Sequence, residues 1–135
     1  MSVGELAAEA ALALVGVPFR LHGRDPRTGL DCVGVAAAAL GGEGRLGPVA
    51  SGYALRSGDS AMVARSLLRA GLVETDEPQP GDVIAVRAGA GQVHLVVLVR
   101  GGIVHADAML RKVVFRPGAV PWPVLGIWRI GDKEE

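Results

Sequence analysis

Residues 29–40, GLDCVGVAAAAL, predict a buried helix that begins at the only cysteine of the chain. Alanine and its small apolar neighbours favour a helix from Cys32 to Leu40. Asp31 can cap the amino end, and the Gly-Gly pair after Leu40 can end the helix. Cys32 then lies in the first turn, where the helix dipole and free backbone N–H groups favour the thiolate. A lone cysteine among small apolar residues is also a common core residue, so a structural role stays open.

Two further helices are predicted on either side of this segment. Residues 5–15 have an amphipathic pattern that ends at Gly16, and residues 17–31 combine proline, glycine and charge as a loop does. Residues 60–70 place apolar side chains at helical spacing, and Gly71 ends that helix.

The pattern changes after the EPQPGD segment at residues 77–82. Five runs rich in β-branched residues follow, separated by glycine or proline, and they predict strands. They are residues 82–88, 93–99, 102–108, 112–116 and 124–130. Helices followed by strands predict an α+β fold, with N-terminal helices packed on a C-terminal antiparallel β-sheet, in a single domain over residues 1–135.

Composition excludes several classes of partner and site. Fourteen basic and fourteen acidic residues balance, so no net charge attracts nucleic acid or a membrane surface. One cysteine cannot form an intrachain disulfide, and neither a metal nor a cofactor is expected. The amino terminus lacks basic residues and carries Glu5 and Glu9, which predicts a folded helix and not a signal peptide. Synthesis in the cytoplasm is therefore expected, with any export by another route.

Two histidines interrupt apolar strands in the second half of the chain. His94 begins the run HLVVLV, and His105 lies within IVHADA. A single strand histidine is most often structural. A cysteine, a histidine and a third polar group, however, are the components of an activated thiol nucleophile, in which the third group orients the imidazole.

The Gly101-Gly102 pair predicts a two-residue hairpin turn between these strands. That register places His105 across from Leu98, four residues from His94 and roughly 13 Å along the strand. Asp107 is then offset by only two residues and shares the face of His94. Asp107 is therefore an alternative orienting residue.

In their order along the chain, these residues resemble the NlpC-type cell-wall peptidases, a papain-like group of cysteine endopeptidases. The likeness covers residues 13–34, 79–99 and 101–108, with an aromatic-Arg-x-x-Gly loop, Asp-Cys-x-Gly, Pro-Gly-Asp, a strand that begins with histidine, and a final His-Ala. The resemblance implies Cys32 as nucleophile and His94 as general base. It also implies His105 as the residue that orients His94.

Two residues depart from the family pattern. Phe19 stands where tyrosine is usual, so a hydroxyl that would help to stabilise the oxyanion is missing. Val33 stands where serine is usual. His22 and Arg20 belong to the same loop as Phe19 and are candidate replacement donors, although a solvated loop histidine is the simpler interpretation of His22.

The resemblance implies a cysteine endopeptidase that cuts peptidoglycan stem peptides at a γ-D-glutamyl to diamino-acid bond. The Asp-Cys-Val-Gly segment and its preceding loop look most like the branch found in tailed phages and gene-transfer agents. Tail proteins would then be partners, and the enzyme would act in the periplasm or cell wall. The alternative is a tail-hub structural subunit with weak or no activity. A lipid-directed thiol acyltransferase is disfavoured, because such enzymes commonly place the histidine before the cysteine.

Overall fold

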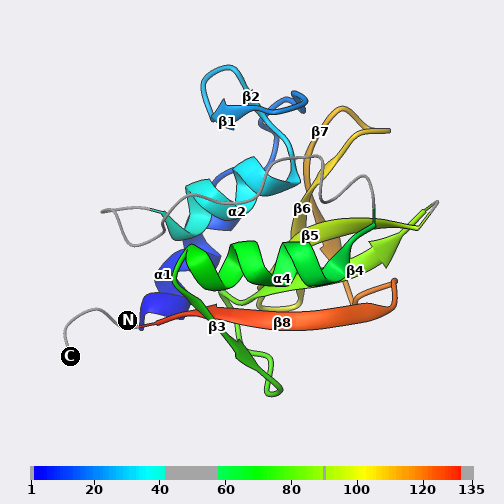
Figure 1. Cartoon of the computed structure of the whole chain (residues 1–135). Helices are drawn as coiled ribbons and strands as arrows, with labels where there is room; N and C mark the ends of the chain where they lie inside the picture. The colour runs from blue at the N-terminus through cyan, green and yellow to red at the C-terminus, as the bar shows by residue number, and fades with distance from the viewer. Residues whose placement is uncertain (1, 42–57, 90, 132–135) are drawn as a thin grey trace.

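The computed structural model describes residues 2–41, 58–89 and 91–131. Helices come first in these residues and an antiparallel sheet follows, which confirms the α+β prediction (Figure 1). The elements in chain order are α1 (Val3–Leu12), β1 (Arg24–Asp25), β2 (Gly29–Leu30), α2 (Cys32–Leu40), α4 (Ser60–Arg69), β3 (Leu72–Thr75), β4 (Val83–Ala88), β5 (Gln92–Val99), β6 (Gly102–Asp107), β7 (Lys112–Pro117) and β8 (Val124–Ile130).

The larger sheet has the strand order β3-β8-β4-β5-β6-β7, and every neighbouring pair is antiparallel. Two strand features were missed in the sequence. β3 follows α4 directly, and the expected loop contains the short β1–β2 hairpin. Residues 17–19 also bond to the β7 edge, where the Phe19 N–H donates to the Arg111 carbonyl. The loop before α2 is thereby attached to the sheet.

The helix boundaries follow from their caps. α1 begins two residues before the predicted start, because Ser2 and Glu5 form a reciprocal capping box. α2 has the predicted bounds, with the Gly34 N–H donating to Asp31 at its amino end. Gly41 is its C-cap, whereas Gly42 lies outside the described residues. None of the helices in the described segments has the length and apolar character needed to cross a membrane.

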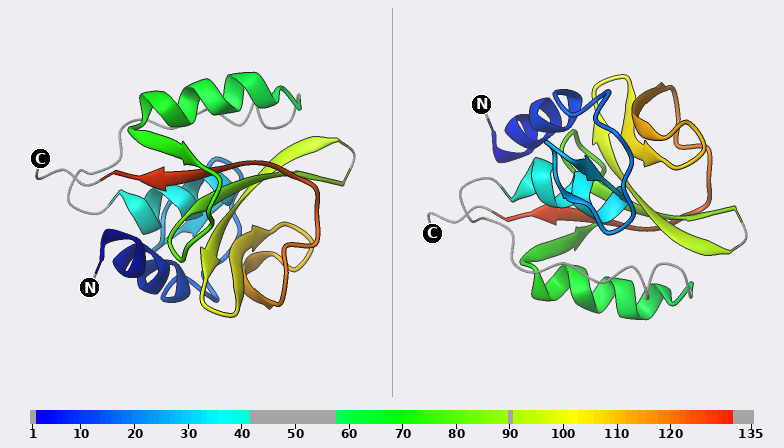
Figure 2. Two further views of the ribbon diagram at one scale, coloured as in Figure 1. Left: turned by 90° about the horizontal axis from the view of Figure 1, so that it is seen from below. Right: turned by 90° about the horizontal axis from the view of Figure 1, so that it is seen from above.

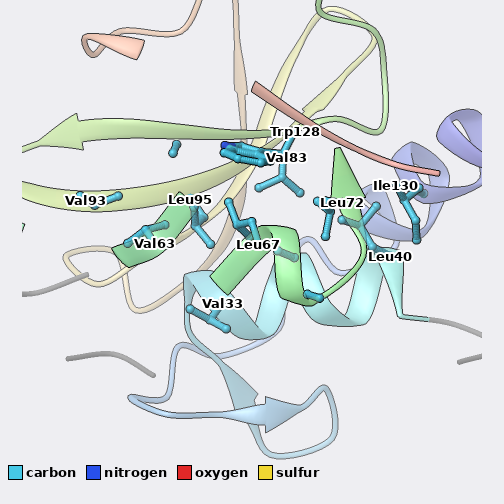
Figure 3. Close-up of a cluster of buried hydrophobic side chains, with 14 residues drawn as sticks. Val33, Leu40, Val63, Leu67, Leu72, Val83, Val93, Leu95, Trp128 and Ile130 are labelled. Atoms are coloured by element: carbon cyan, nitrogen blue, oxygen red, sulfur yellow. The ribbon is translucent and has the colours of Figure 1, made fainter. Parts of the chain in front are cut away.

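The three helices of the described segments cover one face of the larger sheet. Alternate residues of β4 and β5, such as Val83 and Leu95, face α2 and α4 and form one apolar cluster with them (Figure 3). A second cluster joins α1 to β5, β6 and β7, so α1 and α4 lie over different ends of the sheet (Figure 2). The intervening residues Ile84, Val96 and Ile103 point to the opposite face and contact Trp122 there.

The turn between β5 and β6 differs from the predicted one. The observed pairs are Val97 with Val104, Leu98 with Ile103, and Val99 with Gly102, so the turn is Arg100-Gly101. Gly101 adopts the positive φ of 85° that the turn requires. Gly102 is a strand residue, where a Cβ would lie 2.2 Å from the Arg116 carbonyl oxygen. The observed pairing is shifted by two residues from the predicted one, and the shift reduces the offset between His94 and His105. The predicted separation of the two histidines is therefore wrong.

The Pro-Gly-Asp segment before β4 has a structural role. Gly81 has a φ of 96° and contacts the backbone of Gly4 in α1, so a larger residue does not fit. Asp82 is 1% exposed, and both of its carboxylate oxygens accept hydrogen bonds from Arg129 at 2.9 Å. This bidentate ion pair joins the start of β4 to β8.

Asp82→Ala is expected to lower the free energy of unfolding by about 2 kcal/mol, because it removes the charged hydrogen bonds from Arg129 and the Gln79 N–H. Urea denaturation at neutral pH measures this loss. The matched control is Asp25→Ala, which breaks an exposed ion pair with Arg27 and should change stability by less than about 1 kcal/mol. Equal losses in the two variants would contradict the assignment.

Candidate active site

β5 and β6 separate beside the candidate residues. Their pairing runs from the turn to Val97 and Val104, and no pairs continue toward His94 and His105. A groove of about 390 Å³ opens at this point. It is lined by Phe19, Leu21, Asp31, Cys32, Ala88, Gly89, Gln92, Val93, His94, His105, Ala106, Asp107, Ala108, Met109 and Trp122. The structure thus brings Cys32, His94, His105, Asp107 and Phe19 to one groove.

The two histidines are in direct contact. Nε2 of His94 lies 3.0 Å from Nδ1 of His105, a hydrogen-bond distance, and the rings are nearly perpendicular. The observed register makes this contact possible, because His105 is offset from His94 by two residues and not by four. If His94 donates from Nε2, its Nδ1 carries no proton and remains available as a base. The catalytic roles of the pair stay a prediction.

Asp107 has a different set of partners. Its Oδ1 accepts the backbone N–H groups of Met109 and Leu110, at 2.9 Å and 3.0 Å. Its negative charge raises the pKa values of both histidines, against the lowering that burial causes. The carboxylate thus holds the turn after β6, while a histidine ring occupies the hydrogen-bonding position beside His94.

Cys32 is half-buried at the amino end of α2, against β5. Burial raises the pKa of its thiol to about 11, and the charge of Asp31 adds to this effect. Backbone N–H groups of Leu95 and Val33 lie at the sulfur and favour the anion, but they do not offset the desolvation. The sequence predicted a pKa below that of a free thiol. That prediction is wrong, because the sulfur is desolvated at the helix end.

Alkylation measures this state of Cys32. At pH 8 the folded protein should react with iodoacetamide about tenfold more slowly than the protein in urea. The thiolate fraction falls about 100-fold for a pKa rise of two units, and the higher nucleophilicity of the more basic thiolate offsets part of that fall. Labelling of the folded protein at or above the rate in urea would contradict the raised pKa.

His94 is also shifted toward its neutral form. Burial lowers its pKa to about 4, and the neighbouring His105 contributes to the lowering. A neutral imidazole therefore faces a groove that contains a neutral thiol. No hydrogen bond joins Cys32 to His94 among the contacts of these two described residues, as is common before substrate binds. This arrangement supports proton transfer during attack on a substrate, in place of a preformed thiolate–imidazolium pair.

The residues before and after Cys32 have structural partners. Asp31 is 6% exposed, and besides capping α2 it accepts the His22 N–H at 2.9 Å and pairs with Arg24 at 2.7 Å. Val33 is fully buried in the cluster between α2 and the sheet, so its side chain lies outside the groove. The departure from the family pattern at Val33 therefore affects the packing of the core and not the lining of the groove.

The two loop candidates have different positions. Phe19 lines the groove, its N–H donates to the Arg111 carbonyl, and its neighbours Pro18 and Arg20 bond to Leu30 of β2. His22 has an exposed side chain and a left-handed backbone with φ of 63°, and it does not line the groove. This exposed position agrees with the simpler interpretation of His22 as a solvated loop histidine, and it gives no support to His22 as a candidate oxyanion donor.

Trp122 is a groove residue that sequence reasoning missed. Its ring packs edge-on against both histidines, with centroid distances of 5.7 Å to His94 and 5.4 Å to His105. The Arg116 guanidinium lies 5.9 Å from the same ring. Trp122 contributes to the burial of the histidine pair, and its place between two prolines in PWP was the available signal. In the segments that the structure describes, no three His, Cys, Asp or Glu residues are grouped to hold a metal ion.

Comparison with known proteins finds similarity in structure. No family model and no curated protein matches the sequence. Among solved structures, NlpC1 from Trichomonas vaginalis superimposes with a TM-score of 0.66 and 24% identity, over 96% of this chain and 45% of NlpC1. RipB, a peptidoglycan hydrolase from Mycobacterium tuberculosis, superimposes with a TM-score of 0.66 and 23% identity, over 97% of this chain and 66% of RipB. The P60 domain of an antigen from M. avium subspecies paratuberculosis superimposes with a TM-score of 0.61 and 24% identity, over 97% of this chain and 96% of that domain.

These structures define the class of the fold. The chain has the papain-like fold of the NlpC/P60 structures, with N-terminal helices packed on a C-terminal antiparallel sheet. It spans less than half the length of NlpC1 and of NlpC2 from the same organism, at 45% and 47%.

Proposed function

We propose that this protein is a cysteine endopeptidase that hydrolyses peptidoglycan stem peptides. The observation that carries the proposal is the groove in which Cys32, His94 and His105 meet, with the two histidine rings 3.0 Å apart. The papain-like fold and the peptidoglycan hydrolase RipB among its structural neighbours support the same substrate class. The proposed bond, from the resemblance, joins γ-D-glutamate to a diamino acid.

The proposed reaction uses the neutral resting state of the site. Nδ1 of His94 takes the proton from Cys32 as the sulfur attacks the scissile carbonyl. The amino end of α2 contributes backbone N–H groups toward the oxyanion. The imidazolium then protonates the leaving amine, and the carbon–nitrogen bond breaks to leave a thioester. Water activated by His94 hydrolyses the thioester and restores the thiol.

A second candidate is a structural subunit with the same fold and little activity. The raised pKa of Cys32, about 11, and the lowered pKa of His94, about 4, favour it, because both oppose formation of the reactive ion pair. Phe19 adds to this support, since it brings no hydroxyl to the groove.

Digestion of purified peptidoglycan separates the two candidates. The wild-type protein should release new amino groups and shortened stem peptides, detected by mass spectrometry, whereas Cys32→Ala should release none. Equal release by both proteins, or none by either, would contradict the proposed enzyme.

Delivery is a separate part of the proposal. The likeness of the Asp-Cys-Val-Gly segment to the tail-associated branch supports a protein carried by a phage or gene-transfer-agent tail into the periplasm or cell wall, with tail proteins as partners. Immunogold labelling of purified particles from the producing strain should place the protein on tails. Its recovery only in particle-free fractions would contradict this.

A further inference from the structure

The described residues that line the groove include no lysine or arginine. Its charged members are the carboxylates of Asp31 and Asp107. Asp31 is neutralised by Arg24, at 2.7 Å. Asp107 accepts only backbone N–H groups, so its charge has no cationic partner. Arg116 lies 5.9 Å from the Trp122 ring but does not line the groove, so the charges that a ligand contacts directly are those of the two carboxylates.

The rim of the groove is apolar and open. Leu21 is 59% exposed and Met109 is 91% exposed, and both line the groove from different loops. Phe19 and Trp122 add two half-buried aromatic rings. Exposed apolar side chains beside a concave site are typical of ligand contact surfaces.

We propose that the groove selects peptides whose residue on the acyl side of the scissile bond is uncharged, with a carboxamide in place of a free α-carboxylate. This inference rests on the proposed function, since it places the scissile carbonyl at Cys32. A free carboxylate loses hydration on entering the groove, finds no lysine or arginine among the described lining residues, and is repelled by Asp107. A carboxamide carries no charge, so it loses less hydration free energy and is not repelled.

Two peptides that differ only in this group test the inference. They are L-alanyl-γ-D-glutamyl-L-lysine and L-alanyl-γ-D-isoglutaminyl-L-lysine, which carry a carboxylate and a carboxamide at the same position. The wild-type kcat/KM should be about tenfold higher for the carboxamide peptide, the factor that corresponds to one unpaired polar group. Equal values, or a preference for the carboxylate, would overturn the inference.

A positive charge placed on the rim should weaken the preference for the carboxamide peptide. Met109→Arg adds a cation beside the groove at a side chain that is almost fully exposed, so the fold should be unaffected. The selectivity ratio should move toward the carboxylate peptide by about fivefold. Leu110→Arg is the matched control: Leu110 is the next residue of the same turn, is 59% exposed and does not line the groove. Its ratio should stay at the wild-type value, and an equal shift in both variants would overturn the inference.

Binding to Cys32→Ala, measured by calorimetry, separates this inference from the proposed hydrolysis. If the wild-type protein cuts neither peptide while the carboxamide peptide binds more tightly, the inference stands and the proposed enzyme fails. If both peptides are cut at equal rates, the enzyme stands and the inference fails. Absence of both cutting and binding overturns both.

Discussion

Replacing His94 with alanine is expected to reduce hydrolysis of peptidoglycan peptides by about 10³-fold, because the reaction loses its general base. His94 lines the groove with Cys32, and its Nε2 contacts His105, which leaves its Nδ1 as the candidate proton acceptor. The thiol of Cys32 is neutral at pH 7, so attack depends on a partner that removes its proton. Steady-state rates with a synthetic stem peptide measure the loss.

His22→Ala is the matched control, since His22 is the third histidine of the chain and its exposed side chain lies outside the groove. Its activity should remain near that of the wild type. Similar losses in the two variants would show that His94 has no special role.

The pH profile gives a second measure of His94. Burial lowers its pKa to about 4, so the imidazole is neutral and able to accept a proton at all higher pH values. The rate should therefore fall as the pH drops through about 4, and not through the usual histidine range. An acidic limb near pH 6.5 would contradict the lowered pKa.

The second large effect is expected at His105. His105→Ala should reduce the rate by about 10² to 10⁴-fold, because the His94 ring loses the partner that holds its orientation and tautomer. Asp107→Asn should reduce it less than tenfold, about the effect of a nearby unpaired charge. The asparagine oxygen can still accept the N–H groups of Met109 and Leu110.

His105→Asn distinguishes orientation from a general structural role. Its amide oxygen can accept a hydrogen bond from Nε2 of His94, so part of the activity should return relative to His105→Ala. Urea denaturation should show the same stability for both His105 variants. A larger loss for Asp107→Asn than for His105→Ala would make Asp107 the orienting residue.

Much of the fold follows from local sequence signals. The cap at Asp31 and the alanine run specify α2, and alternation of β-branched residues locates β4 to β8. The same signals placed Cys32 at a helix start and both histidines on strands. Each depends on residues that are close in sequence, which is why it could be predicted. β3 was missed because four residues carry too little pattern.

The geometry of the site required the tertiary structure. Which glycine of the Gly101-Gly102 pair forms the turn depends on β7, since the Arg116 carbonyl leaves no room for a side chain at Gly102. That choice moves the register by two residues and brings His105 to His94. A residue pattern with period two predicts the face of a strand but not its register.

Distant contacts also set the charge state and the boundary of the groove. The helix start and a nearby imidazole predicted a lowered pKa for Cys32, but packing of α2 against β5 desolvates the thiol and raises its pKa to about 11. Trp122 reaches the histidine pair from a loop, and Arg129 reaches Asp82 across 47 residues of chain. The sequence by itself determined the three described helices, strands β4 to β8, and the candidate residues Cys32, His94 and His105. Only the tertiary structure decided register, burial and protonation, because these depend on atoms that the chain brings together from far apart.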